Sequence, residues 1–504
     1  MIRNLLTKTP FSRVTPDGYM QGSMTTLPDA SSYFEGRLMY QIVSQADFVR
    51  EYYPSGHKIN SPLFYPNIVK YDEKSGKFFE QQVFRASFPF QQIILVQQLI
   101  HLCGNDIHHE LTDAVADNAR DKLFLEFQKG WLEKNMEIAF YEFAKSVKIT
   151  GDGAIVVYIK DGKAGYRNLS FLNGDTLFPH YDSETGELVA FARKYQDYDI
   201  SGKTRTSWIE VWDKKTLTRY RQDFDGIGDR IANKVRDWLG LDGYTQDGEP
   251  QLHGFDEVPV VYHRDSGPCW EASQDSIDKY ELAVSQLCQN NMAYAFPIMV
   301  LKGDDVEIKG DIYGSVKAIT MGSDDAAEYL SHPDATSSFE LQLKVLLDNI
   351  FQGSFIVKPP EIKSGDLPGV AIKLIYSPSL EKAIIDSREF DRDVDALSRL
   401  FKFAYAVELK KSSQFANMRI FSWIEPYVHQ NTAELINNLV QLTGSEILSR
   451  QTATDLTGYG RNQEWDRIIK ERKEEQMADR LTDINGQNGT GTDTTGKAIP
   501  AQEA

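Results

Sequence analysis

The chain has 504 residues, a formal net charge of -18 and an apolar fraction of 41%. This length predicts roughly two to four domains, each large enough to bury its own core. The negative charge argues against a protein that reads a nucleic-acid sequence, because such proteins carry basic surfaces.

The sequence contains no segment that predicts a membrane span or a signal peptide. A span needs about 18 uninterrupted apolar residues. The best candidate, 88–102, is interrupted by Gln91, Gln92, Gln97 and Gln98. No apolar segment follows the early basic residues Arg3 and Lys8. The cysteines are odd in number and lack metal-like spacing, which predicts buried thiols in a reducing compartment: Cys103, Cys269 and Cys288.

The first half of the chain changes from a helical period to a period of two. Residues 1–30 are expected to be loosely ordered, and 33–85 is rich in aromatic residues. Helices are predicted at 91–102, 111–126 and 130–148, with the last two separated near Lys129-Gly130. Strands are then predicted at 154–160, 165–171, 176–181, 187–196, 206–213, 217–222 and 258–263, with a short helix at 231–239. Asp161-Gly162 predicts a hairpin turn, and antiparallel strands beside helices indicate an α+β fold.

Two helices with narrow apolar stripes bracket a short acidic insert in the middle of the chain. The apolar residues of each stripe are three or four positions apart, which predicts helices that pack lengthwise against neighbours. The first helix is expected over 273–292, with the stripe Ile277, Tyr280, Val284 and Leu287. The second is expected over 338–351, with the stripe Phe339, Leu343, Leu346 and Ile350. Strands are expected in the insert at 297–301, 316–321 and 327–330, pairing with an adjoining subunit. The two helices would form a stalk with the insert as a small head at its tip. Such stalks could pack side by side in a ring of identical subunits around a channel. An isolated helical hairpin is the alternative.

The C-terminal part is helical. Ser377-Pro378 predicts the start of a helix that runs to about 409, followed by a strand at 418–426. Asn431 and Glu434 have capping-box spacing, and Ser449 and Asn462 are further predicted N-caps. A tail without large apolar residues begins after 482 and is expected to be disordered.

The sequence offers little enzyme chemistry. The densest group of ligand types is His101, Cys103, His108, His109 and Glu110. Its spacing matches no zinc template, and a helix end with a turn at 104–106 is favoured. Asp304, Asp305, Asp324 and Asp325 could hold a divalent ion, but a solvated acidic face explains them better. We therefore predict no catalytic residue, cofactor or metal site. A metal-dependent hydrolase that uses the His108/His109 region remains the alternative.

The order of these parts resembles the portal proteins of tailed double-stranded DNA bacteriophages, of the long-tailed, siphovirus-like type. The resemblance covers roughly 90–480 and rests on several segments taken together. These are the helices with Asn135 ahead of the strand begun by 151–154, the segment 177–182, the segment 254–261 just before the helix expected over 273–292, and the segment 423–453.

The resemblance implies an α+β ring subunit with an α/β wing, a two-helix stem, a small α/β clip and a helical crown. The implied parts are an N-terminal arm (1–30), the wing (31–265 and 376–426), the stem (266–292 and 337–352), the clip (293–336), a tunnel loop (353–375), the crown (427–481) and a disordered tail (482–504).

It further implies a non-enzymatic, dodecameric homo-oligomer at the capsid vertex of a virion, assembled in the host cytoplasm. Double-stranded DNA would be packaged through its channel by a separate terminase motor and later ejected. The implied partners are the terminase large subunit, a head-tail adaptor, the major capsid protein and scaffold, without cofactor or membrane. A neck or tail adaptor without DNA contact is a further alternative.

Three groups of residues are then expected to carry the function. Lys358 and Lys363 flank Pro359-Pro360 in the implied tunnel loop and would contact DNA phosphates. Asp304, Asp305, Asp324 and Asp325 would present a negative collar to the motor or adaptor. The stem would pack through Ile277, Val284, Leu287, Leu343, Leu346 and Ile350.

Overall fold

The structure is a computed structural model, and the chain divides into two compact units. The first comprises Met1–Glu361 with Tyr376–Val428, and the second Ile362–Ile375 with His429–Ala504. The described residues are 45–72, 76–112, 118–182, 184–198, 205–224, 244–294, 299–302, 307–309, 318–320, 326–329, 336–358, 369–428, 432–456 and 464–487. Several predictions lie outside them: the arm at 1–30, the helix at 231–239, the caps Asn431 and Asn462, Lys363, and all four aspartates of the insert.

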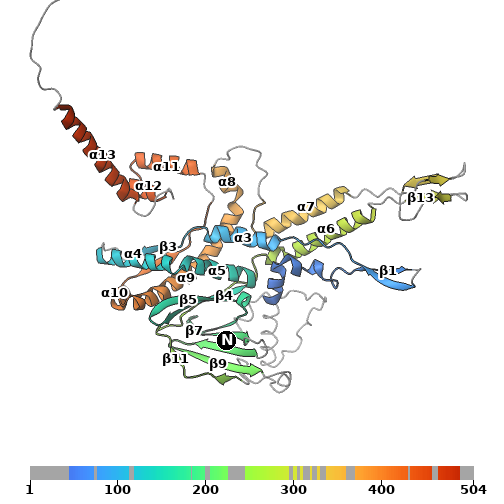
Figure 1. The fold of residues 1–504 in the computed structure, drawn as a ribbon, viewed down its shortest axis with the longest axis horizontal. Coiled ribbons are helices and arrows are strands. Elements are labelled where there is room, and N and C mark those ends of the chain that lie inside the picture. The colour runs from blue at the N-terminus through green and yellow to red at the C-terminus, as the bar shows by residue number, and fades with distance from the viewer. Residues whose placement is uncertain are drawn as a thin grey trace, which may run out of the picture. The chain divides into compact units, whose positions relative to one another are not determined.

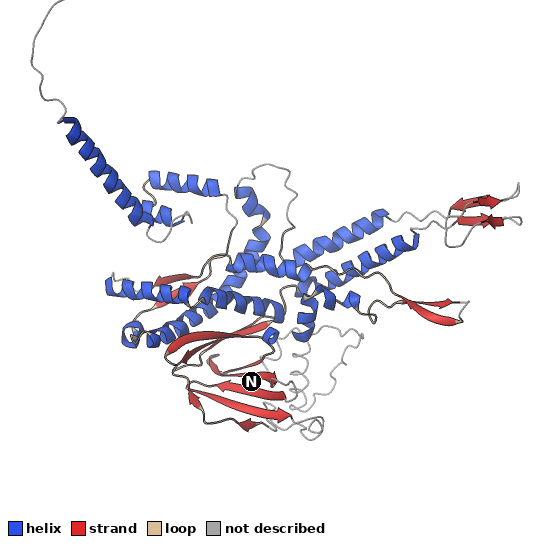
Figure 2. Ribbon diagram, viewed as in Figure 1, coloured by secondary structure: helices blue, strands red, loops and turns tan. Residues whose placement is uncertain are grey.

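Two antiparallel sheets form the β-rich half of the first unit (Figure 2). The smaller has the order β12-β4-β5, built from β4 (Asp152–Lys160), β5 (Lys163–Leu169) and β12 (Val260–Arg264). The larger is a meander of β6 (Thr176–Tyr181), β7 (Leu188–Tyr198), β8 (Arg205–Trp212) and β9 (Thr216–Phe224), extended by β10 (Thr245–Gln246) and β11 (Gln251–Leu252). Asp161 and Gly162 both have positive φ at the β4–β5 turn. The predicted strands, hairpin turn and α+β class are confirmed.

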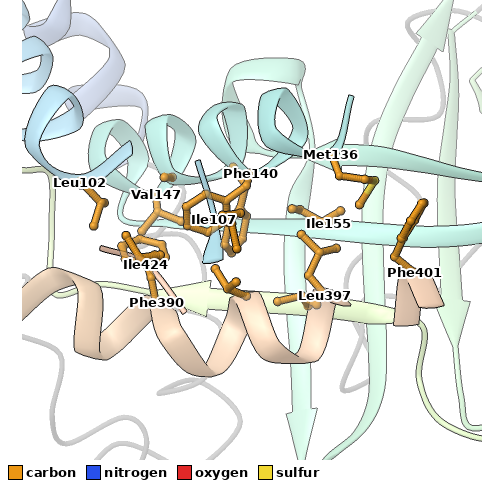
Figure 3. Close-up of a cluster of buried hydrophobic side chains, with 14 of the residues drawn as sticks. Leu102, Ile107, Met136, Phe140, Val147, Ile155, Phe390, Leu397, Phe401 and Ile424 are labelled. Atoms are coloured by element: carbon orange, nitrogen blue, oxygen red, sulfur yellow. The ribbon is translucent and has the colours of Figure 1, made fainter. Parts of the chain in front are cut away.

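Two helices, α5 (Met136–Thr150) and α9 (Ser377–Glu408), pack on the smaller sheet. Three more helices pack in turn on these two: α3 (Phe90–Cys103), α4 (Asn118–Glu133) and α10 (Ser412–Ala416). Figure 3 shows Phe140 of α5, Ile155 of β4 and Phe390 of α9 in one cluster of buried side chains, and the Phe140 and Phe390 rings lie 5.9 Å apart between centroids. The long helix that Ser377-Pro378 predicted is α9. A further pair of strands, β3 (His108–Leu111) and β17 (Ile420–Trp423), joins distant parts of the chain.

Two predicted helix boundaries are wrong. The helix expected from 111 begins only at Asn118, because 108–111 is a strand paired with β17. The break expected near Gly130 lies at Lys134-Asn135, where Asn135 takes a left-handed φ of 56°. Gly130 instead lies inside α4, where a Cβ would come within 2.4 Å of the Tyr405 ring. This glycine therefore permits α4 to approach α9 closely.

We predict that Gly130→Ala destabilises the protein by about 1–3 kcal/mol, because the Tyr405 ring must shift. The matched control is Gly444→Ala at the end of α11 (Thr432–Gly444), where an added Cβ meets nothing within 4 Å. Helix propensity alone favours alanine at both positions by up to about 1 kcal/mol. Thermal unfolding should show a lower midpoint only for Gly130→Ala. An unchanged or raised midpoint for that variant would contradict the packing role.

A buried ion cluster ties α5 and α9 to the loop after β12. Lys148 Nζ lies 3.1 Å from Asp386 Oδ2 and 3.4 Å from Asp265 Oδ2. Burial opposes the charge of Lys148, but the two carboxylates outweigh it and raise the lysine pKa.

The three cysteines are free. Burial raises the pKa of Cys103 and Cys269 to about 12, which makes both poor nucleophiles.

The second unit contains α8 (Gly369–Ile375), α11 (Thr432–Gly444), α12 (Arg450–Leu456) and α13 (Glu464–Gln487). Ser449 caps α12 as predicted, because its Oγ accepts from Thr452 N at 3.1 Å. Two expectations need correction: α8 is helical within the segment predicted as a loop, and α13 continues past 482 into the predicted disordered tail. None of the helices in the described ranges is long and apolar enough to cross a membrane.

Candidate functional site

The two stripe-bearing segments form antiparallel helices, α6 (Gln274–Tyr294) and α7 (Thr336–Gly353) (Figure 1). Ser273 Oγ donates to Ile350 O at 2.9 Å, which joins the start of α6 to the end of α7. Between them in the chain lie β13 (Met299–Lys302), β14 (Glu307–Lys309), β15 (Ala318–Thr320) and β16 (Ala326–Tyr329). The insert thus contains β structure, as expected. Its strands pair within the chain, β13 with β16 and β14 with β15. The expected pairing with an adjoining subunit stays a prediction.

The stripe residues fall into two groups. Ile277 and Ile350 are fully buried in the main core, with Tyr280 packed against them. The remaining members are half-buried in the single chain: Val284, Leu287, Phe339, Leu343 and Leu346. The end of the helix pair that contains Ile277 and Ile350, which we call its base, is therefore fixed to the main core. Towards the insert, the two helices leave apolar side chains uncovered.

An open groove of about 470 Å³ runs between α6 and α7. It is lined by Lys279, Leu282, Ala283, Gln286, Ser338, Leu341, Gln342, Val345 and Leu346. Leu341 is 63% exposed and Val345 is 49% exposed, which is unusual for large apolar side chains standing together. The predicted stripe runs through Leu343 and Leu346 and does not include these two residues. Their separation of four residues on one helix face was the available signal.

The segment that follows strand β2 (Lys77–Gln81) is held along α6 by a ladder of side-chain acceptors. The backbone N–H groups of Phe84, Ala86 and Phe88 donate to Gln289 Oε1, Ser285 Oγ and Glu281 Oε1 at 2.9, 2.9 and 2.8 Å. Four helical residues rise about 6 Å, and two extended residues span about 6.6 Å. Polar residues at every fourth helix position therefore meet alternate amides of the segment, which we call the strap (83–88).

Glu281 of the same ladder also forms a buried hydrogen-bonded pair with His57. His57 Nδ1 is 2.6 Å from Glu281 Oε1, and both side chains are only 1% exposed. His57 Nε2 is held by Glu51 O at 2.8 Å, and Trp270 Nε1 donates to Glu51 Oε2. Residues before position 90, for which the sequence predicts no role, thus fix the orientation of α6. Nothing in the spacing of these residues revealed that role, because the partner is 224 positions away.

The glutamines that interrupt the apolar run of α3 hold the chain that leaves α7. Gln97 both donates to Val357 O and accepts from Val357 N, each at 3.2 Å. Gln98 donates to Ser354 O at 2.9 Å. Lys358 follows directly and is exposed. The backbone before Lys358 is therefore anchored while its side chain remains accessible.

The model of one protein family, described as phage portal protein, SPP1 Gp6-like, matches residues 41–478. The chain belongs to this family of phage portal proteins. Comparison with curated proteins finds no match. One similar solved structure is the "Neck of empty GTA particle computed with C6 symmetry", with 11% sequence identity, a TM-score of 0.39, and coverage of 83% of this chain and 94% of that chain.

Membership in the portal family confirms the resemblance and places the chain among structural, non-enzymatic components of phage heads. The histidines singled out above also have separate environments. His101 Nδ1 lies 2.9 Å from Tyr427 O. His108 pairs with Glu425 at 2.7 Å, whereas His109 lies 2.8 Å from Ser422 Oγ.

The predicted turn around these histidines continues into strand β3, which explains their divergence. Adjacent side chains in a strand point to opposite faces, so His108 and His109 cannot converge on one ion. Burial, and to a smaller extent His108, lower the pKa of His109 to about 4. Within the described ranges, no group of His, Cys, Asp and Glu is arranged to hold a metal. This geometry gives no support to the hydrolase alternative.

Proposed function

We propose that this portal-family chain is the subunit of a dodecameric ring through which double-stranded DNA enters and leaves a phage capsid. The observation that carries the proposal is the antiparallel α6/α7 pair, whose base is anchored by the strap and the His57–Glu281 pair and whose groove is apolar and open. A ring of copies would cover these grooves and align the helix pairs around a channel.

The parts of the chain receive the following assignments. The wing is 31–265 with 376–426, the stem 266–292 with 337–352, the clip 293–336 and the crown 427–481. The N-terminal arm is 1–30. The tunnel segment 353–375 includes helix α8, and the tail 482–504 begins within α13. The clip would hold the terminase motor during packaging and the head-tail adaptor afterwards, and the major capsid protein and scaffold would surround the ring in the assembling head.

Charge supports passage of DNA without tight binding. The 73 acidic residues outnumber the 55 basic ones, which opposes the phosphate contacts that release counterions and drive non-specific affinity. A ring of this composition would repel the duplex over most of its surface, so translocation would be driven by the ATP-hydrolysing terminase rather than by the ring itself.

Heads assembled in host cells with and without this chain test the function. Heads that lack the chain are expected to contain no packaged DNA, and supplying the chain in trans should restore packaging. Loss of a neck or tail adaptor would instead give DNA-filled heads without tails. Heads that fill normally in the absence of the chain would contradict the portal assignment and favour the adaptor.

We predict that Lys358→Ala with Lys363→Ala leaves rings intact but reduces packaging or retention of DNA, because the loop loses its candidate phosphate contacts. The matched control is Lys129→Ala on α4, whose lysine side chain is 73% exposed. Packaged DNA length and its retention in purified heads are the measurements. Full-length packaging and normal retention in the double variant would remove the lysines from any DNA-contacting role.

Replacing Asp304, Asp305, Asp324 and Asp325 by asparagine should weaken docking of the adaptor and make the remaining docking less sensitive to salt. Rings should still form. Glu184→Gln with Glu187→Gln, on the exposed β6–β7 turn, is the control with charge removed elsewhere. Adaptor association measured at two salt concentrations decides the point. Undiminished docking with unchanged salt dependence in the fourfold variant would contradict the proposed role of the four aspartates in adaptor binding.

A further inference from the structure

A two-stranded hairpin before the strap exposes an apolar face. It comprises β1 (Ile68–Asp72) and β2 (Lys77–Gln81), with Tyr71 opposite Phe78 and Val69 opposite Glu80. Val69, Tyr71 and Phe78 therefore share one face, and they are 61%, 55% and 74% exposed. The rings of Tyr71 and Phe78 lie 5.0 Å apart between centroids. No third strand joins this sheet within the described part of the chain.

Such a hairpin is marginally stable in water by itself, because two strands bury too little apolar surface. Its sequence nevertheless places three large apolar side chains together on one face. In the working protein this face is expected to be covered by something outside the subunit.

Hydrogen bonds fix the chain on either side of the hairpin, and this defines the position of its apolar face. Arg85 Nη2 donates to Tyr65 O and to Asn67 Oδ1, both at 2.8 Å, which ties the strap to the chain just before β1. The strap in turn is fixed to α6 by the ladder at Ser285 and its neighbours. The hairpin and the α6/α7 pair project to the same side of the body (Figure 1).

We propose that the Val69/Tyr71/Phe78 face of one subunit packs into the α6/α7 groove of the next subunit. The proposal rests on the proposed ring, and it adds which two surfaces of the chain meet. A ring is built from heterologous contacts, in which two different patches of the same chain meet at every interface. The hairpin face is one apolar patch, and the groove with Leu341 and Val345 is the other.

The position of the groove favours it over other exposed apolar residues. It is continuous with the proposed stem interface and opens along the helix to which the strap is fixed. Leu125 on α4 is 62% exposed as well. However, α4 packs on α5 and α9, away from the strap. Leu125 therefore serves as the control position.

Cysteine pairs with a short bismaleimide cross-linker test the contact in assembled rings. Phe78→Cys with Leu341→Cys should give a ladder of covalent multimers on a denaturing gel, because each link joins one copy to the next. Tyr71→Cys with Val345→Cys is an independent second pair. Each single variant, and Phe78→Cys with Leu125→Cys, should remain at least tenfold less cross-linked. The unsubstituted chain measures background from the native cysteines.

Native mass measurement of the same samples separates this contact from the function itself. Intact rings with no ladder from either pair would overturn the hairpin contact and leave the portal proposal standing. Equal ladders from the Leu125 control would also overturn it, since the cross-linking would then be unspecific. Absence of rings from the unsubstituted chain would overturn both proposals.

Discussion

Replacing Leu341 and Val345 together by aspartate is expected to abolish ring assembly while leaving each subunit folded. Both side chains are largely exposed in the single chain, so the substitution costs little in the subunit itself. In a ring that covers the groove, the two carboxylates would be buried without partners, which costs several kcal/mol at every interface. Native mass measurement should therefore find monomers where the unsubstituted chain gives rings.

Lys344→Asp on the same helix is the control, because this exposed residue is not among those lining the groove. It should retain rings, apart from a modest effect of the changed charge. Circular dichroism and thermal unfolding should show near-normal subunits for both variants. Rings of normal mass and stability in the Leu341/Val345 variant would mean that the groove faces solvent in the assembly.

Removing His57 is expected to lower the free energy of unfolding by about 3–5 kcal/mol, because His57→Ala leaves Glu281 buried without its partner. Glu281 Oε1 would keep only the N–H of Phe88. Adding Glu281→Gln should recover part of the loss, since a neutral amide is easier to bury and its oxygen can still accept from Phe88. Chemical denaturation of the single and double variants gives the coupling energy.

The neighbouring Lys58–Asp278 pair provides the comparison. Its atoms are 2.6 Å apart, but the lysine side chain is 27% exposed. Lys58→Ala should therefore cost at most about 1 kcal/mol. If His57→Ala proved as mild as Lys58→Ala, the buried pair would not be what fixes the base of α6.

The sequence predicted those parts of the fold that local patterns determine. A period of two identified β4 to β9, and Asp161-Gly162 identified the turn between β4 and β5, because side-chain alternation and turn conformation are local properties. Likewise, Ser377-Pro378 marked the start of α9. Gly130 is not a helix break, because the reason for a glycine here is tertiary: the Tyr405 ring occupies the space that a Cβ would fill.

The contacts that anchor the helix pair could not be predicted for the same reason. Gln97 and Gln98 were treated as interruptions of an apolar run, whereas they hold backbone more than 250 residues later in the chain. The strap and His57 act on α6 across a similar separation. A one-dimensional pattern does not show which distant backbone a polar side chain will satisfy. The roles of Lys358, Lys363 and the four aspartates of the insert stay predictions.

Native mass measurement combined with particle images of the purified, unsubstituted chain tests the central claim most directly. The account predicts rings, twelve subunits in the form built into virions, with a central channel and the α6/α7 pairs aligned around it. A monodisperse monomer of 57.3 kDa, or a small compact oligomer without a channel, at concentrations where portal assembly is expected would contradict it.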